Sequence, residues 1–268
     1  MCLFGYSFSD KYLYHYTTME KLLMYILPHK QLRLSSLSKT NDPHEISSRH
    51  FNLIDDLNLS NDGESFDNFI PDQEHFSNAL KNNIIVLCFA QDDMLLCGVS
   101  RLGKGFLKPR MWAQYADNHL GACLFINKAK FIDSFTYNFK NHYSRHRNII
   151  YDDMVSEQKY NAYSLKSSEY TKYSINEIVS NRINEYADIY YFSKHSDWKE
   201  ENEYRFILEY PSADAYINIE DSLEGIALGI HTDGKLIPTI KLLLNHYSHT
   251  PLINRLIYKN EYHIVPCE

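Results

Sequence analysis

The stretch IIVLCFA, at residues 84–90, constrains the fold more than any other part of the sequence. All its residues are apolar, and a short apolar run of this length is typical of a strand buried on both faces. We therefore expect a central strand here. A sheet with a buried central strand needs neighbouring strands and covering helices, which the rest of the chain must supply.

Candidate strands and helices alternate irregularly along the chain. Strand-like patterns occur at residues 12–16, 32–36, 121–126, 203–209 and 262–265. Helical patterns occur from Thr17 to Pro28, from the end of a polar loop at residues 59–68 to about Asn82, and at residues 111–119, 174–190 and 240–244. Thr17 and Glu20 form a capping box for the first of these helices, and Pro28 is expected to end it. Because a regular βαβ rhythm is absent, we predict a single α+β domain over residues 1–268, with a split, mostly antiparallel sheet flanked by helices.

Composition limits the classes of partner. The chain has 268 residues, 44% of them apolar, which is enough for a substantial core. Its formal net charge is −7, which argues against a general affinity for nucleic acid or anionic membranes. Local basic segments could still bind such partners.

Cysteine usage and hydropathy indicate a cytoplasmic location. The five cysteines show no CxxC spacing, and their odd number is typical of reduced thiols. No apolar run reaches the roughly 20 residues that span a bilayer, and the N-terminus lacks the pattern of a signal peptide. We therefore expect no membrane interaction.

Two segments concentrate positive charge. Residues 100–110 carry cations and no acid, and we interpret them as a mobile basic loop that could meet a substrate. Its cations are Arg101, Lys104, Lys108 and Arg110. Residues 128–148 form a second basic segment, rich in aromatic residues. A polar loop is expected at residues 59–68.

Several motifs fail on inspection. GVSRLGKG at residues 98–105 resembles a phosphate-binding P-loop but ends in Gly105, where a hydroxyl should hold magnesium. Two histidine pairs, His142 with His146 and His246 with His249, lack nearby acidic or cysteine partners, so no metal site is predicted.

Three clusters of polar and aromatic residues remain, and their order along the chain is specific. They are Tyr14, His15, Tyr16 and Thr17 with Asn41, Asp42, Pro43 and Glu45; Trp112, Tyr115 and Gly121; and Trp198, Glu201, Glu203 and Arg205. Together they resemble the bacterial "domain of unknown function 2971" family over residues 12 to about 210. Residues 211–268 would then be a C-terminal strand-helix-strand extension. The segment LLCGVSRLGKGFLKPR before Trp112 departs from the family pattern, in which acidic residues run almost straight into the tryptophan.

The order of motifs is also similar, more loosely, to that of ADP-ribosyltransferases of the His-Tyr-Glu type. This likeness implies NAD as co-substrate and a carboxylate that stabilises an oxocarbenium-like transition state. The catalytic candidates are Glu203 or Glu201, with Tyr115 and His15; the NAD-binding candidates are His15, Tyr16, Thr17, Arg33, Ser35, Asn41, Asp42, Trp112 and Arg205. In this hypothesis His15 donates to a ribose hydroxyl, an aromatic side chain stacks on nicotinamide, and Arg205 or Arg33 binds the pyrophosphate. The enzyme would be of toxin or anti-phage defence type, modifying a protein or nucleic acid.

Other interpretations remain open. The clusters could form a non-catalytic sensor for a nucleotide or nucleic acid. Asp152, Asp153 and Glu157 faintly resemble a metal-dependent nuclease core, although that core needs its Glu-x-Lys on a strand and this stretch has a helical pattern. In purely structural terms, His15 would bond a carbonyl, Trp112 would be core, and Glu201, Glu203 and Arg205 would form an ion-pair network.

Overall fold

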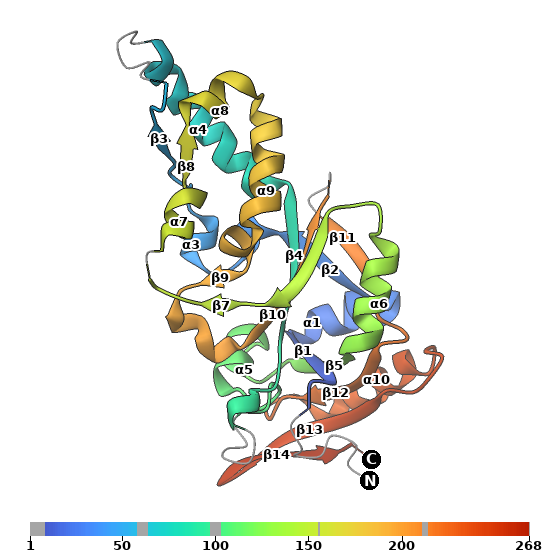
Figure 1. Cartoon of the computed structure of the whole chain (residues 1–268). Helices are drawn as coiled ribbons and strands as arrows, with labels where there is room; N and C mark the ends of the chain where they lie inside the picture. Colours follow the sequence, from blue (N-terminus) through green and yellow to red (C-terminus); the bar gives the residue numbers. More distant parts are fainter. Residues whose placement is uncertain (1–8, 58–63, 97–102, 155, 211–213, 268) are drawn as a thin grey trace.

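Strand β4 (Ile84–Ala90) lies in the interior of the main sheet and is buried along most of its length. The computed structural model describes residues 9–57, 64–96, 103–154, 156–210 and 214–267 (Figure 1). The prediction of a central strand at residues 84–90 is confirmed with the same bounds. The apolar run has this place because both of its faces contact other elements.

The main sheet has ten strands within the described residues, and its neighbours are antiparallel except for β12 and β13. Its path runs β11-β2-β4-β1-β5-β12-β13-β14, with β10 and then β6 joined to the other edge of β4. Besides β4, its strands are β1 (Tyr12–Thr17), β2 (Gln31–Ser36), β5 (Ala122–Asn127), β6 (Ser144–Asn148), β10 (Glu203–Glu209), β11 (Asp214–Asn218), β12 (Leu223–Leu228), β13 (Leu252–Lys259) and β14 (Glu261–Pro266). Two small parallel pairs are β3 (Asn52–Ile54) with β8 (Ser164–Lys166), and β7 (Ile150–Tyr151) with β9 (Ser193–Lys194).

The sheet divides at β4, as predicted. Strand β10 pairs along the whole of one edge of β4, but two different strands share the other edge. There β2 pairs with β4 as far as Val86, and β1 pairs with it at Ala90. Within the described residues, the ladder on this edge therefore skips positions 87–89. We call this gap between β1 and β2 the fork.

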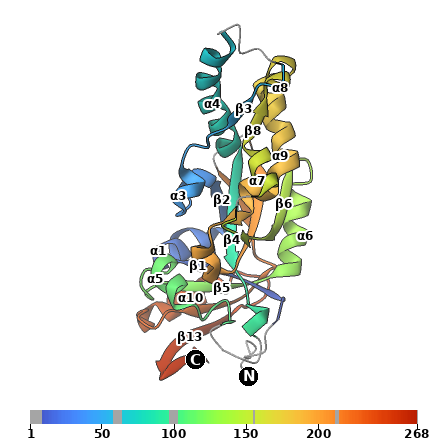
Figure 2. The same cartoon turned by 60° about the vertical axis from the view of Figure 1, so that its left-hand side comes forward.

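Helices cover both faces of the sheet and extend beyond its end. Helices α4, α8 and α9 project past one end of β4 together with the β3–β8 pair, whereas β13 and β14 lie at the opposite end (Figures 1 and 2). The helices are α1 (Met19–Lys21), α2 (Leu27–His29), α3 (Pro43–Ile46), α4 (Glu64–Asn82), α5 (Pro109–Tyr115), α6 (Lys128–Asn138), α7 (Glu157–Ala162), α8 (Ser167–Lys172), α9 (Ile175–Tyr191) and α10 (Ile237–Leu244). The π-helix is η1 (Leu22–Ile26), and the 3-10 helices are η2 (Leu37–Lys39), η4 (Met94–Leu96), η6 (Ser196–Glu201) and η7 (Gly234–Leu236).

Three apolar clusters hold these layers together. The first packs α6, α10 and η1 against one face of the sheet, and includes Phe131, Phe206 and Leu124. The second lies under α4 and α9 and includes Val86 and Ile207. The third packs α5 against β1 and β5. Alternate residues of β10 contribute to different clusters because successive side chains of a strand point to opposite faces.

The first helical region differs from the prediction at both ends. Its cap is Thr18 and not Thr17, because the Thr18 side chain accepts a hydrogen bond from the Lys21 amide. The chain also stays helical past Pro28 to His29. The π-helix η1 ends two residues before this proline, and the helical region ends where Lys30 adopts a left-handed conformation.

The loop predicted at residues 59–68 is wrong for its second part, because α4 begins at Glu64. The residues before Glu64 in that segment lie outside the described ranges. Within the described residues, no helix is both long enough and apolar enough to cross a membrane.

The C-terminal segment is part of the main sheet. Strand β11 extends the sheet beside β2, and β12 pairs with β5. Helix α10 connects β12 to the parallel strand β13 and buries Ile240 and Leu244 in the first apolar cluster. The predicted order of strand, helix and strand occurs in β12, α10 and β14, and β11 and β13 are two further strands that were not expected.

Candidate functional site

A cavity of about 240 Å³ lies at the fork. It is formed where β1 and β2 separate along β4, so the unpaired stretch at residues 87–89 contributes to its wall. Helix α5 and the segment from β9 to β10 close the other sides. The lining comprises Tyr14, His15, Tyr16, Arg33, Ser35, Ser36, Lys39, Thr40, Asn41, Val86, Leu87, Cys88, Phe89, Ala90, Met111, Tyr115, Lys194, Glu201, Glu203 and Arg205.

Most of the predicted site residues meet here, although they come from distant parts of the chain. Those in the lining are His15, Tyr16, Arg33, Ser35, Asn41, Tyr115, Glu201, Glu203 and Arg205. Thr17 instead lines a second hollow beside the cavity. Asp42 is buried, and its carbonyl accepts from the Glu45 amide at the start of α3. The structure thus brings the N-terminal, central and late clusters of the sequence to one place.

His15 bridges the gap in the sheet. Its Nδ1 lies 3.2 Å from the carbonyl oxygen of Cys88, on the stretch of β4 that has no ladder partner at the fork. Burial lowers the pKa of His15 to about 4, although the Cys88 hydrogen bond opposes this, so the ring is neutral near pH 7. Since Nδ1 must donate to a carbonyl, Nε2 is the acceptor. The predicted donor role toward a ribose is therefore wrong for Nδ1, and the ring offers an acceptor instead.

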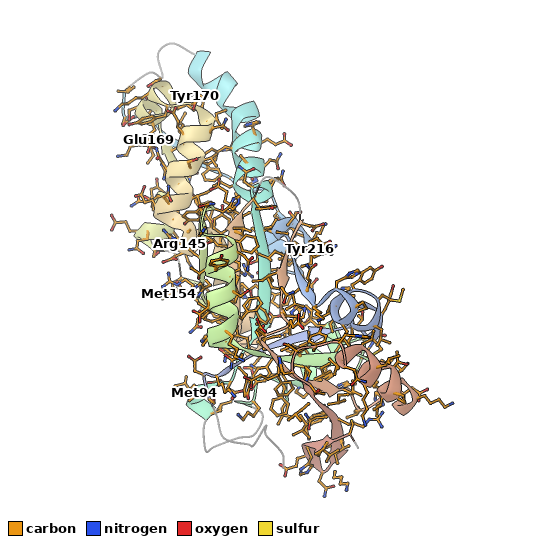
Figure 3. All side chains as sticks on the ribbon, turned by 90° about the vertical axis from the view of Figure 1, so that its right-hand side faces the viewer. Met94, Arg145, Met154, Glu169, Tyr170 and Tyr216 are labelled. Atoms are coloured by element: carbon orange, nitrogen blue, oxygen red, sulfur yellow. The ribbon has the colours of Figure 1, made fainter. Side chains whose placement is uncertain are left out.

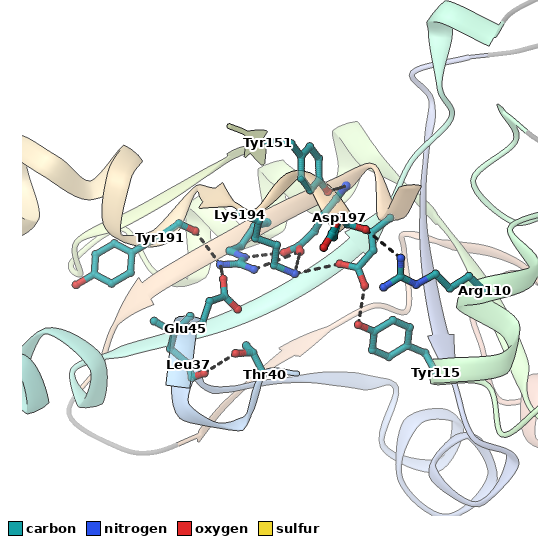
Figure 4. A network of polar contacts seen from close by, with 12 residues as sticks. Leu37, Thr40, Glu45, Arg110, Tyr115, Tyr151, Tyr191, Lys194 and Asp197 are labelled. Atoms are coloured by element: carbon teal, nitrogen blue, oxygen red, sulfur yellow. Dashed lines mark hydrogen bonds and ion pairs between the residues drawn. The ribbon is translucent and has the colours of Figure 1, made fainter. Parts of the chain in front are cut away.

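Glu203 and Arg205 form the buried centre of the ionic network beside the cavity (Figure 4). Arg205 is 0% exposed, and its Nε donates to Glu203 Oε1 at 2.6 Å. Its Nη1 donates to Glu45 Oε1 at 2.5 Å and to the carbonyl of Tyr191 at 2.8 Å. Burial alone would raise the pKa of Glu203, but the charges of Arg205 and Lys194 outweigh it and lower that pKa to about 2. Glu203 is therefore ionised.

Lys194 joins Glu203 to Glu201. Its Nζ lies 2.7 Å from Glu203 Oε2 and donates to Glu201 Oε2 at 3.0 Å. The other oxygen of Glu201 accepts from the Tyr115 hydroxyl at 2.7 Å. Burial, and then the charge of Glu201, raises the pKa of Tyr115, so this hydroxyl keeps its proton. Figure 4 shows Tyr115 and Lys194 in this network, with their polar contacts as dashed lines.

Lys194 and Glu45 were missed as site residues by sequence reasoning. Lys194 lies on β9, a strand too short to give a periodic signal, and its importance depends on contacts with Glu201 and Glu203. Glu45 belongs to the Asn-Asp-Pro-x-Glu motif, and that membership was the one available signal. Its side chain reaches Arg205 across the fold.

Two predicted NAD-binding residues are structural. Trp112 is fully buried, its Nε1 donates to the Phe106 carbonyl at 2.8 Å, and its ring packs edge-on against Tyr16. It cannot stack on a ligand in the cavity. Glu203, Glu45 and the Tyr191 carbonyl accept from four of the five N–H donors of Arg205, which leaves it little capacity to bind a pyrophosphate. For these two side chains the contacts favour the structural interpretation.

The prediction of a mobile basic loop is wrong for two of its three described cations, which are buried. Lys104 is 3% exposed and pairs with Asp92 at 2.6 Å. Lys108 is buried and donates to the Glu200 carbonyl at 2.6 Å. Arg110 is exposed, and donates to the Asp197 carbonyl while its guanidinium lies over the Trp198 ring. Arg101 lies outside the described residues. Lys108 and Arg110 therefore attach the start of α5 to the segment before β10, and Lys104 attaches the preceding segment to Asp92.

The residues of the nuclease alternative lie in a separate region. Glu157 is the first residue of helix α7, so its Glu-x-Lys is helical, as its pattern indicated. Asp152 pairs with Lys159, and Asp153 accepts from the Ser196 amide. Within the described ranges, no group of three or more His, Cys, Asp or Glu side chains is placed to hold a metal ion.

The cavity combines charge, hydroxyl groups and rings. Arg33 and Lys39 supply cations, Ser35, Thr40 and Asn41 supply neutral hydrogen-bonding groups, and Glu201 supplies a carboxylate. Such a set suits a polar ligand that carries hydroxyls and an anionic group.

Comparison with known proteins identifies one relationship. Residues 111–206 match a family model described as "Protein of unknown function (DUF2971)". No curated protein and no solved structure matches the chain. The matched segment contains the central and late clusters, and the two N-terminal motifs lie before it. The predicted resemblance to the DUF2971 family is therefore confirmed over residues 111–206, where the chain is similar to that family.

Proposed function

We propose that the cavity at the fork binds NAD and that the protein is an ADP-ribosyltransferase-like enzyme. The observation that supports this most strongly is the convergence of His15, Tyr115 and Glu201 on the lining of one cavity. Carboxylates beside aromatic walls are what cleavage of the nicotinamide glycosidic bond requires. A toxin or anti-phage defence role, and a protein or nucleic acid as acceptor, stay predictions.

In this proposal Glu201 is the acid that faces the ligand. Both oxygens of Glu203 are engaged by Arg205 and Lys194, which leaves it as a positioning residue. Among the described residues, each oxygen of Glu201 accepts one hydrogen bond, and a carboxylate oxygen can accept more than one. It can therefore accept from a ribose hydroxyl and stabilise positive charge developing on the ribose.

The reaction is a substitution at the ribose carbon. The bond between C1′ and the nicotinamide nitrogen breaks, and its electron pair leaves with nicotinamide. An acceptor oxygen, or water, forms the new bond to C1′ and loses its proton. The neutral His15 offers Nε2 to a ligand hydroxyl. Tyr16 and Tyr115 line the cavity, and Tyr115 is partly exposed, so its ring is available to a nicotinamide.

A non-catalytic nucleotide sensor is the second candidate. The observation that favours it is that Glu201 and Glu203 already have partners. Lys194 and Arg205 neutralise their charges, and the Tyr115 hydroxyl donates to one oxygen of Glu201. Buried ion-pair networks of this kind also serve as scaffolding. A nucleotide that binds and remains uncleaved after long incubation would favour the sensor.

The two candidates are separated by following NAD. The protein is incubated with labelled NAD, with and without cell lysate as a source of acceptor, and nicotinamide release and label transfer are measured. We expect both in the wild type and a decrease of about 100-fold or more in Glu201→Gln, a loss typical of removing one group that stabilises transition-state charge. Glu157→Gln, a substitution of the same kind on α7, is expected to keep full activity.

The same series tests the remaining alternative. Wild-type protein that releases no nicotinamide and transfers no label under any of these conditions would contradict the enzymatic proposal. Metal-dependent loss of DNA or RNA that disappears in Glu157→Gln and persists in Glu201→Gln would point to a nuclease.

A further inference from the structure

A second, larger hollow adjoins the cavity on the other side of the fork. It has a volume of about 750 Å³ and shares His15, Arg33 and Ser35 with the cavity. The rest of its lining is Thr17, Glu20, Lys21, Tyr25, Ile26, His29, Gln31, Leu32 and Tyr216. We call this hollow the β2 groove. None of the functional residues discussed so far, apart from the three shared ones and Thr17, belongs to it.

Cations outnumber acids in the lining of the β2 groove. The cations are Lys21 and Arg33, and both are exposed. Glu20 is the acid in the lining, and Asp214 lies 3.9 Å from Arg33 Nε, at the limit of an ion pair. Arg33 thus keeps donors available for a ligand, and its place between the two hollows lets it reach an anion in either one.

Two exposed tyrosines accompany these cations. Tyr25, on η1, is 59% exposed, and Tyr216, on β11, is 57% exposed. Figure 3 shows Tyr216 on the outside of the sheet near β2. Large apolar rings left in water beside cations are typical of surfaces that stack bases and bind phosphates.

The wall of the groove has an unusual backbone. Tyr25 and Ile26 belong to the π-helix η1, in which the Leu27 amide donates to the Leu22 carbonyl, five residues back. Such π-helical turns are rare and occur frequently at functional sites. The turn is a second feature, independent of the side-chain chemistry, that indicates a binding surface.

From these observations we propose that the β2 groove binds a nucleoside phosphate, with the phosphate on Lys21 and Arg33 and the base against Tyr25 or Tyr216. The ligand chemistry is shared by a free nucleotide, by one end of a dinucleotide and by a residue of a single nucleic-acid strand. The proposal does not depend on NAD cleavage in the neighbouring cavity.

Binding to the full-length chain tests the proposal directly. AMP, NAD, inorganic phosphate and a short fluorescent single-stranded RNA are titrated separately at low salt. We expect AMP to bind more tightly than phosphate, and Lys21→Ala with Arg33→Ala to weaken AMP binding about tenfold or more. Tyr25→Ala is expected to weaken it about fivefold or more, because a stacking ring is lost.

Matched variants separate the groove from general effects of charge and surface rings. Lys235→Ala together with Lys259→Ala removes two exposed cations outside the groove, and is expected to leave AMP binding unchanged. Tyr137→Ala removes a ring on α6 that is 74% exposed, and is expected to have no effect. The titrations also distinguish the sources of the ligand. RNA that binds more tightly than AMP, with a steep salt dependence, indicates single-stranded nucleic acid, and competition between AMP and NAD indicates a free nucleotide.

The outcomes are distinct from those of the proposed function. Glu201→Gln is expected to bind AMP like the wild type, whether or not the wild type cleaves NAD. AMP binding that is undetectable, equal to that of inorganic phosphate, or unchanged in the Lys21 and Arg33 double variant would overturn the proposal. A protein that binds AMP through the groove and never cleaves NAD would refute the enzymatic proposal alone.

Discussion

Arg205 is the side chain on which the other charges of the site depend. It is fully buried, and its guanidinium holds Glu203, Glu45 and the carbonyl of Tyr191. The spacing of Glu203 and Arg205 places both on the same face of β10. Removing one member of such a network leaves the others charged, buried and unpaired, which costs far more than the loss of an exposed ion pair.

Replacing Arg205 by methionine is therefore expected to lower the free energy of unfolding by about 3–5 kcal/mol. Urea unfolding followed by fluorescence measures this change. Arg147→Met on β6 is the control, because Arg147 pairs with Asp188 where both side chains are roughly half exposed. It is expected to have little effect. Equal losses in both variants would show that the buried network has no special role.

His15 gives the stability a defined dependence on pH. Its pKa is about 4 in the folded chain, mainly because of burial, against 6.5 as the ordinary value. Between these two values the unfolded chain binds a proton at this position and the folded chain does not. The free energy of unfolding therefore falls as the pH decreases from 6.5 toward 4, and this contribution does not change further below that range.

The variant His15→Gln removes this contribution while keeping a side chain able to donate a hydrogen bond. Its loss of stability between pH 7 and about pH 4.5 is expected to be smaller than that of the wild type. Urea unfolding at both pH values gives the comparison. Parallel curves for the two proteins would mean that His15 titrates equally in the folded and unfolded chains.

At the scale of elements, the predicted strands β1, β2, β4, β5, β10 and β14 are present, whereas β3, β6, β7, β8, β9, β11 and β13 were not predicted, and neither were the partners of any strand. The sequence of β10 predicts its bounds because alternation of apolar and polar residues is a local signal. The fork depends on which strands share the edge of β4, and no local pattern carries that information. The basic segment before α5 was misread for the same reason, since Lys104 is buried by a partner twelve positions away, Asp92.

The turn after α5 packs closely against the end of β1, and this gives a prediction for Gly121. A Cβ at Gly121 would lie 2.2 Å from the Thr17 carbonyl oxygen, so Gly121→Ala must move backbone that follows the helix. We expect a clear loss of stability, detected as a lower melting temperature. Gly234→Ala is the control, because its nearest contact would be the end of Arg255 at 3.7 Å. A Gly121→Ala protein as stable as this control would contradict the packing.

At the scale of the whole molecule, the C-terminal strands complete the sheet. Strand β12 covers the edge of β5 and β11 covers the edge of β2, and Ile226 and Leu228 are buried in the first apolar cluster. The family-like core predicted at residues 12–210 therefore lacks neighbours for two of its strands. Without them these edges would be exposed and prone to association.

A fragment that ends at residue 210 is accordingly expected to remain unfolded or to aggregate. Circular dichroism and size-exclusion chromatography would detect the loss of the native sheet and of a monodisperse species. The matched fragment starts at Ser9 and keeps residues 9–268, and is expected to fold like the full chain. A folded, cooperative fragment lacking residues 211–268 would show that the extension is an independent addition.

The gap in the ladder of β4 also affects how the two parts of the sheet are coupled. On that edge β2 and β1 both pair with β4 but not with each other, so their relative twist is set through one intervening strand. A molecule bound in the gap between β1 and β2 would contact both strands and restrict their relative motion. Amide hydrogen exchange should then slow on both strands at once when a ligand binds, even where the ligand touches only one.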